Sequence, residues 1–210
     1  MTPAVTPDVA GMPVPARRRF AALLFLLVSF ALALVAQGAH AVPYNSTSEG
    51  GDSKLMLKGH DPVAYFTDGR HVPGNPAFRS EVDGATYRFA SAEHKAMFDK
   101  DPEKYAPQFG GFCSNGIVYG IPWGGDPDTW KIIDGKLYIF GGESSQRYFL
   151  MDEAKNLELA RKYWKEEVDG SIGIVQRIWR LIWRVPHYRS GKQLEQEYQQ
   201  RLKSGEIKAG

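Results

Sequence analysis

The sequence predicts an α+β protein: a small antiparallel sheet of hairpins with packed helices, followed by a C-terminal amphipathic helical extension. Two patterns lead to this prediction. Asp-Gly pairs at positions 68–69, 83–84 and 134–135 lie between segments rich in β-branched or aromatic residues, which is typical of tight hairpin turns. Apolar residues also recur at helical spacing, first after Ser91 and again after Glu153.

Strands are expected on either side of the Asp-Gly pairs. Their positions are about 64–67, 78–82, 86–89, 130–133 and 137–140. In the last two, the side chains at 130, 132, 137 and 139 share one face if the chain reverses at Asp134-Gly135. This alternation predicts a hairpin with one strongly apolar face.

Two helices are expected beside these hairpins. Ser91 is a suitable N-cap for a helix that ends at Asp101-Pro102, where a new turn begins. A second helix is expected over residues 153–167, and Asp169-Gly170 ends it. Both helices carry apolar stripes, so we expect them to cover the hairpins.

The first 41 residues have the pattern of an export signal. Arginines at 17–19 precede an uncharged apolar run over 20–36, and Ala39-His40-Ala41 supplies the small residues that signal peptidases require. We expect cleavage after Ala41, a periplasmic or secreted location, and a linker over residues 42–54. The run is also near the shortest length that spans a bilayer, so an uncleaved anchor is the alternative.

Composition narrows the classes of function. A formal charge of +2 gives no indication of nucleic-acid binding. Without residues 1–41, which hold three arginines and Asp8, the 26 basic and 24 acidic residues become 23 of each. A single cysteine excludes a disulfide within the chain.

Three segments resemble the YHS-domain family. They are Gly59-His60-Asp61-Pro62-Val63-Ala64-Tyr65-Phe66, Gly84-Ala85-Thr86-Tyr87-Arg88-Phe89-Ala90-Ser91, and Phe98 followed by Asp101-Pro102-Glu103-Lys104-Tyr105. The continuation through Gly110-Gly111-Phe112-Cys113 and Trp130-Lys131-Ile132-Ile133-Asp134-Gly135 resembles an exported branch that includes suspected selenoproteins. The domain suggested by this resemblance, with its C-terminal hairpin and helix, covers residues 55–170.

The resemblance implies a small domain that handles heavy metals, often through cysteine ligands. At the positions where such members carry cysteine, this chain has Ala64, Ala90 and His94. Two of the implied ligands are therefore methyl groups, which cannot coordinate a metal.

The remaining residues with metal-binding chemistry are His60, His94 and Cys113. Imidazole and thiolate ligands suit copper and zinc, so this set predicts a copper or zinc site if the fold brings the three together. In the alternative interpretation, His60 hydrogen-bonds a turn and His94 is a satisfied core histidine.

Cys113 also supports a redox hypothesis, in which it is the catalytic residue. A single thiol in an exported protein is metal-bound, chemically used or buried. Without a second cysteine, a redox cycle needs an external thiol. No hydrolase triad or nucleotide-binding loop occurs in the sequence. We therefore favour a binding module for a metal ion or small ligand over an enzyme, with a structural domain as a further alternative.

The segment over residues 171–210 is a basic tail outside the resemblance. From Ile172 onward it holds eight basic residues and three acidic ones. Arginines and aliphatic or tryptophan residues separate onto opposite arcs of a helix over 172–184, which is typical of a helix in a membrane interface. The residues expected to contact an anionic membrane are Arg177, Trp179, Arg180, Trp183 and Arg184. The alternative is a helix that docks on the domain itself or on a protein partner, which the sequence does not identify.

Overall fold

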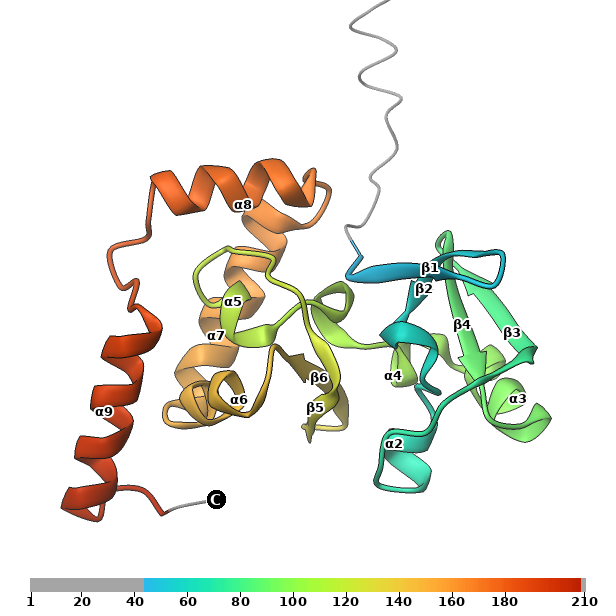
Figure 1. Ribbon diagram of the computed structural model, residues 1–210, viewed down its shortest axis with the longest axis horizontal. Helices are drawn as coiled ribbons and strands as arrows, with labels where there is room; N and C mark the ends of the chain where they lie inside the picture. The colour runs from blue at the N-terminus through green and yellow to red at the C-terminus, as the bar shows by residue number, and fades with distance from the viewer. Residues whose placement is uncertain (1–43, 209–210) are drawn as a thin grey trace, which may run out of the picture. The chain divides into compact units, whose positions relative to one another are not determined.

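The structure is a computed structural model that describes residues 44–208. It confirms the α+β class, with one four-stranded sheet and one two-stranded sheet (Figure 1). The export signal predicted for residues 1–41 lies outside the described residues and stays a prediction. The strands are β1 (Ser46–Glu49), β2 (Asp52–Met56), β3 (Asn75–Val82), β4 (Ala85–Phe89), β5 (Asp126–Ile133) and β6 (Lys136–Phe140).

Helices connect and cover these strands. The α-helices are α2 (Ala64–Thr67), α3 (Ala92–Lys100), α4 (Pro102–Tyr105), α5 (Ser114–Ile117), α6 (Glu143–Leu150), α7 (Glu153–Tyr163), α8 (Gly173–Ile182) and α9 (Gly191–Ser204). Short 3-10 turns are η2 (Leu57–Gly59) and η3 (Gln108–Gly111), and α7 continues as the π-helical turn η4 (Trp164–Val168). As predicted, the Ser91 side chain accepts a hydrogen bond from the His94 backbone at the start of α3.

The larger sheet has the order β1-β2-β4-β3. The β3–β4 hairpin is antiparallel and turns at Asp83 and Gly84, whose φ angles are +52° and +73°. Such angles belong to the tight hairpin turn that the Asp-Gly pair predicts. However, β2 and β4 pair in parallel, so the sheet is mixed and not purely antiparallel.

The β5–β6 hairpin lies between two hydrophobic clusters. Leu137 and Ile139 of β6 belong to one cluster, and Tyr138 and Phe140 belong to the other. This division follows from the alternation of side chains along a strand. It also explains why β6 is buried on both faces.

The cluster that contains Leu137 and Ile139 is here called the sheet cluster. Its buried residues are Met56, Leu57, Val63, Tyr65, Ala85, Tyr87, Phe89, Phe98, Tyr105, Leu137 and Ile139. The cluster that contains Tyr138 and Phe140 is called the helix cluster, and its buried residues are Phe109, Phe112, Ile117, Val118, Tyr119, Ile121, Ile133, Tyr138, Phe140, Phe149, Leu157, Ala160, Val168 and Val185. Trp130 pairs with Ile139 and Ile132 pairs with Leu137, which confirms the shared face predicted for this hairpin.

Two sequence-based assignments need correction. Residues 64–67, expected to be a strand, form the short helix α2, in which the Asp68 backbone N–H donates to the carbonyl of Ala64. Aromatic content suggested a strand, but Asp61 caps the backbone of Val63 and Ala64 and starts a helical turn. Residues 42–54, expected to be a linker, contain β1 and the start of β2.

The C-terminal extension forms α8, which lies within the range 172–184 expected from the sequence, and a second helix, α9. Ser190 and Gln193 form a capping box at the start of α9, where side chain and backbone bond reciprocally. Within residues 44–208, no helix is both long and apolar enough to cross a bilayer.

Candidate metal centre

His60 and His71 lie close together because two short segments pair side by side. The Gly74 backbone N–H donates to the Gly59 carbonyl at 2.8 Å, and the Asp61 backbone N–H donates to the Val72 carbonyl at 2.8 Å. His60 and Pro73 are bridge partners in this antiparallel contact. Helix α2 therefore forms part of a loop whose two ends meet at His60.

The ring of His60 is oriented by the backbone. Its Nδ1–H donates to the carbonyl of Leu57 at 3.0 Å. A neutral imidazole with a proton on Nδ1 has its lone pair on Nε2. The Nε2 atom lies 4.0 Å from Oδ1 of Asp128.

His71 lies on the other side of this carboxylate. Its Nδ1 atom is 2.7 Å from Oδ1 of Asp128, and its ring stacks on that of His60 with centroids 5.5 Å apart. The exposed fraction of the side chain rises from 21% for His60 to 44% for His71 and 58% for Asp128. The most constrained residue is thus His60, and the other two have room to adjust.

The segment that carries Asp128 is tied to the sheet cluster. The Tyr65 hydroxyl donates to the carbonyl of Pro127 at 3.1 Å. Burial of the Tyr65 ring raises the pKa of its phenol, and the carboxylates of Asp128, Asp61 and Asp126 add to this effect, so the hydroxyl keeps its proton for donation. On the exposed side, Lys58 pairs with Asp126 at 3.3 Å.

These three residues form a candidate metal centre. His60, His71 and Asp128 each offer one ligand atom, and these atoms lie within 4.8 Å of one another. Among residues 44–208, this is the group in which at least three His, Cys, Asp or Glu side chains bring their ligand atoms this close together. Neither His94 nor Cys113 belongs to it. Of the three residues that the sequence offers as candidate ligands, this group contains His60.

His94 has partners of a different kind. Its Nδ1–H donates to Oδ2 of Asp61 at 2.7 Å, and its Nε2 lies 3.3 Å from the Thr67 hydroxyl. The side chain is 15% exposed. These contacts agree with the alternative in which His94 is a satisfied core histidine.

Cys113 is buried in the region where the chain enters α5. Its residue is 2% exposed, and its sulfur packs close to Gly141. Its backbone N–H donates to the Trp123 carbonyl at 2.9 Å, and its carbonyl accepts from Gly116 and Ile117. Since reactive thiols are partly exposed and structural ones are buried, this position favours a packing role.

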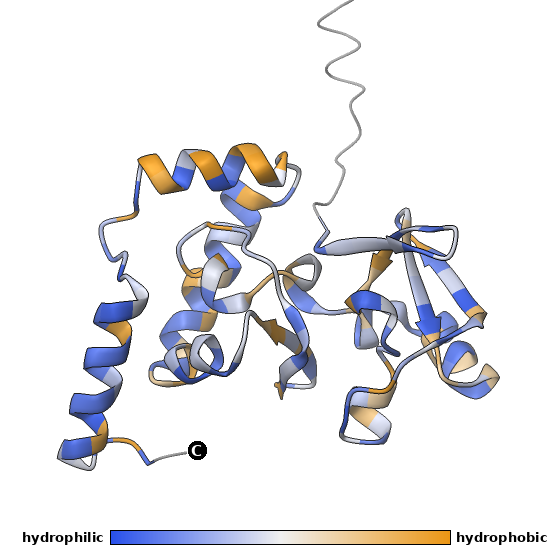
Figure 2. Ribbon diagram, viewed as in Figure 1, coloured by the Kyte–Doolittle hydropathy of each residue, from blue (hydrophilic) through white to orange (hydrophobic). Residues whose placement is uncertain are grey.

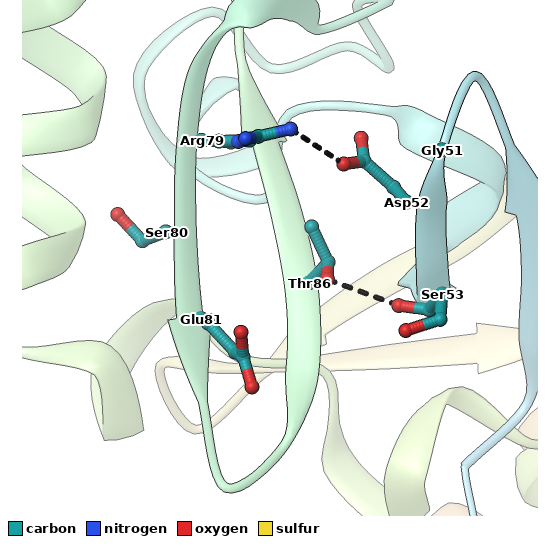
Figure 3. A pocket seen from close by; sticks show the side chains of 7 residues that line it. All are labelled: Gly51, Asp52, Ser53, Arg79, Ser80, Glu81 and Thr86. Carbon is teal, nitrogen blue, oxygen red and sulfur yellow. Dashed lines mark hydrogen bonds and ion pairs between the residues drawn. The ribbon is translucent and has the colours of Figure 1, made fainter.

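A polar cavity of about 330 Å³ lies at the edge of the larger sheet (Figure 3). Arg79 points across it to Asp52, and the Thr86 hydroxyl donates to the Ser53 carbonyl. Asp52 also accepts from Arg88, whose side chain is 5% exposed. These groups bind one another and tie β2 to β3 and β4, so the cavity has a structural explanation.

His71 and Asp128 are candidate ligands that the sequence does not single out. His71 follows the Asp68-Gly69 pair, whose sequence is typical of a hairpin turn, and Asp128 lacks the regular oxygen spacing of a calcium loop. The signal that the sequence does offer is a second histidine eleven positions after His60.

Comparison with known families identifies a YHS domain at residues 63–109. The match covers the segment from the residue before α2 to η3 and includes His71 and His94, whereas His60 and Asp128 lie outside it. No curated protein and no solved structure matches the chain.

Proposed function

We propose that this protein is a metal-binding module that holds one Zn²⁺ or Cu²⁺ ion between His60, His71 and Asp128. The observation that carries the proposal is the hydrogen bond from Nδ1 of His60 to the Leu57 carbonyl. Metal-bound histidines donate their other ring N–H to a carbonyl or carboxylate in this way, which fixes the tautomer and the ring direction. The presence of a YHS domain, a type of domain associated with metals, supports the same function.

The ligand set is compatible with the proposed metals. Two imidazoles and one carboxylate suit Zn²⁺ and Cu²⁺, whereas Cu⁺ prefers sulfur ligands, and the thiol of Cys113 is buried. Ligands bound to zinc at about 2.0–2.2 Å lie roughly 3.5 Å apart in a tetrahedron. His71 and Asp128 are the more exposed ligands, so a small rotation of their side chains closes the group around an ion.

Three protein ligands leave a fourth position for water or for a donor from another molecule. His60 is partly buried and the other two ligand side chains are exposed, so the site lies at the surface and not within the core. A site of this kind suits a protein that takes up and releases a metal. It does not suit a structural zinc site, whose four protein ligands hold a small fold together.

Isothermal titration of metal-free protein with Zn²⁺ and with Cu²⁺ tests the proposal. We expect one ion per chain, and we expect His71→Ala and Asp128→Asn each to weaken binding by about 100-fold, because the first removes an imidazole ligand and the second replaces a carboxylate with a neutral, weaker donor. His187→Ala and Asp134→Asn are matched controls outside the group and should bind as the wild type does. Wild-type affinity in both ligand variants would contradict the proposal.

We also propose that the module works outside the cytoplasm, after removal of residues 1–41. The tripartite pattern of arginines, apolar run and small residues supports this location. N-terminal sequencing of protein from the periplasm or medium should give a chain that begins at Val42. Recovery of intact residues 1–41 in the membrane fraction would instead indicate an uncleaved anchor.

A further inference from the structure

Helix α8 turns its polar side toward the protein and its apolar side outward. Figure 2 shows a broad hydrophobic side on this helix, at the edge of the molecule. The exposed large apolar residues are Ile172, Ile174, Val175, Ile178, Trp179, Leu181, Ile182 and Trp183, with exposed fractions from 43% to 71%. These eight residues are here called the α8 patch. Contiguous apolar patches of this kind mark an interaction surface.

Arginines fix this orientation. Arg180 makes a bidentate ion pair with Glu167, and its Nε donates to Oε2 of that residue at 2.7 Å. Arg177 donates to the Pro122 carbonyl at 2.7 Å. These two arginines were expected to face lipid headgroups and instead attach the helix to the domain, because Glu167 and the Pro122 carbonyl accept their hydrogen bonds.

This attachment removes the usual cost of binding through a short helix. A ten-residue helix is marginally stable by itself in water, since nucleation is unfavourable. Here the folded domain holds the helix in place and presents the α8 patch without further ordering. Preorganised surfaces bind more tightly because less conformational freedom is lost.

We propose that the α8 patch inserts into the surface of an anionic lipid bilayer and holds the protein there peripherally. Between Asp169 and Glu195 the chain contains no acidic residue. Exposed Arg184 follows α8, and exposed Lys54 lies beside Ile172 and Ile174 in a shared cavity at its other end. The patch thus has a cation at each end, which is complementary to an anionic headgroup layer.

Vesicle flotation tests the proposal. Residues 41–210 form one compact unit that contains both hydrophobic clusters, so this segment is used and the apolar run is left out. We expect it to float with vesicles of phosphatidylcholine and phosphatidylglycerol in equal parts, and more weakly with phosphatidylcholine alone. High salt should reduce binding in part by screening the cations.

Two double variants separate apolar contact from loss of fold. Trp179→Ser/Trp183→Ser should lower the partition coefficient by about tenfold or more, because each substitution removes a large apolar side chain. Both tryptophans are more than half exposed, so the core is not changed. Trp179→Phe/Trp183→Phe keeps much of the apolar surface and should stay within about threefold of the wild type.

Three outcomes would overturn the proposal. They are absence of flotation by the wild-type segment, equal flotation by the serine variant, and a stable dimer in sedimentation that the serine variant abolishes. The last outcome would assign the α8 patch to a second copy of the chain. Circular dichroism of each variant confirms that it is folded before flotation is compared.

Discussion

Oδ2 of Asp61 lies 2.7 Å from Nδ1 of His94 and also accepts the backbone N–H of Ala90 at 2.7 Å. Its other oxygen accepts the backbone N–H of Val63 at 2.8 Å. Asp61 is completely buried. One carboxylate therefore joins the start of α2, the end of β4 and the first turn of α3.

Replacement of Asp61 by alanine should destabilise the protein by about 3–5 kcal/mol, because it leaves buried donors without an acceptor. Urea unfolding at neutral pH measures this. Asp68→Ala is the control, since its carboxylate is 4.0 Å from Nε2 of His94 and partly exposed, and it should cost less than about 1 kcal/mol. A similar, small cost for both variants would show that the Asp61 network contributes little.

The ion pair between Asp52 and Arg88 predicts a pH dependence of stability. The hydrogen bond from Arg88 holds the pKa of Asp52 below its usual value. A carboxyl group whose pKa is lower in the folded state stabilises the fold above its unfolded pKa of about 3.9, and this contribution is lost as the pH falls through the folded pKa.

Asp52→Asn should therefore lower the free energy of unfolding at neutral pH, and its difference from the wild type should shrink at about pH 3 or below. Urea titrations at several pH values measure both. Glu81→Gln, which changes an exposed carboxylate at the same sheet edge, should leave the profile unchanged. An Asp52→Asn difference that is the same at every pH would refute this account.

The ion pair between Arg180 and Glu167 should stabilise the attachment of α8 to the domain and slow amide hydrogen exchange in that helix. Arg180→Ala removes a charge-assisted pair that contributes about 1.5–3 kcal/mol, so amide hydrogen exchange in residues 173–182 should accelerate by about tenfold or more. Arg161→Ala serves as the control, because that side chain is 57% exposed and lies 4.0 Å from its acidic neighbour. Unchanged exchange in α8 would mean that other contacts hold it.

Burial of Cys113 predicts that its thiol reacts slowly with reagents in solution. A disulfide reagent such as 5,5′-dithiobis(2-nitrobenzoate) should label the native protein at least about 100-fold more slowly than the protein in denaturant. Cys113→Ala should retain metal binding. Rapid labelling of the native protein at neutral pH would support the redox hypothesis instead.

Local patterns predicted the fold well where they act over short distances. The turns at 83–84 and 134–135 and the cap at Ser91 depend on neighbouring residues, and the structure has all three. The segment 64–67 failed because its helical state depends on Asp61 and on pairing between residues near 60 and 73. The sequence did not predict strands β1 and β2; β2 pairs with its neighbour β1 on one side and, on the other, with β4, which lies about thirty residues away.

The candidate site was harder to predict for the same reason. His60 was identified from its residue type. His71 lies beside it because the backbone at His60 pairs with the backbone at Pro73, and Asp128 follows Pro127, whose carbonyl accepts a hydrogen bond from Tyr65. The expected strand at 64–67 would have placed His71 along a hairpin and away from His60. Helical periodicity separated the arcs of α8 correctly, but only tertiary contacts show which arc faces the protein.

X-ray absorption spectroscopy of the zinc-loaded protein identifies the atoms bound to the metal. We expect only nitrogen and oxygen neighbours at about 2.0–2.2 Å, with multiple scattering from imidazole rings that decreases in His71→Ala. A sulfur neighbour at about 2.3 Å would place the metal at Cys113 and contradict the assignment to His60, His71 and Asp128.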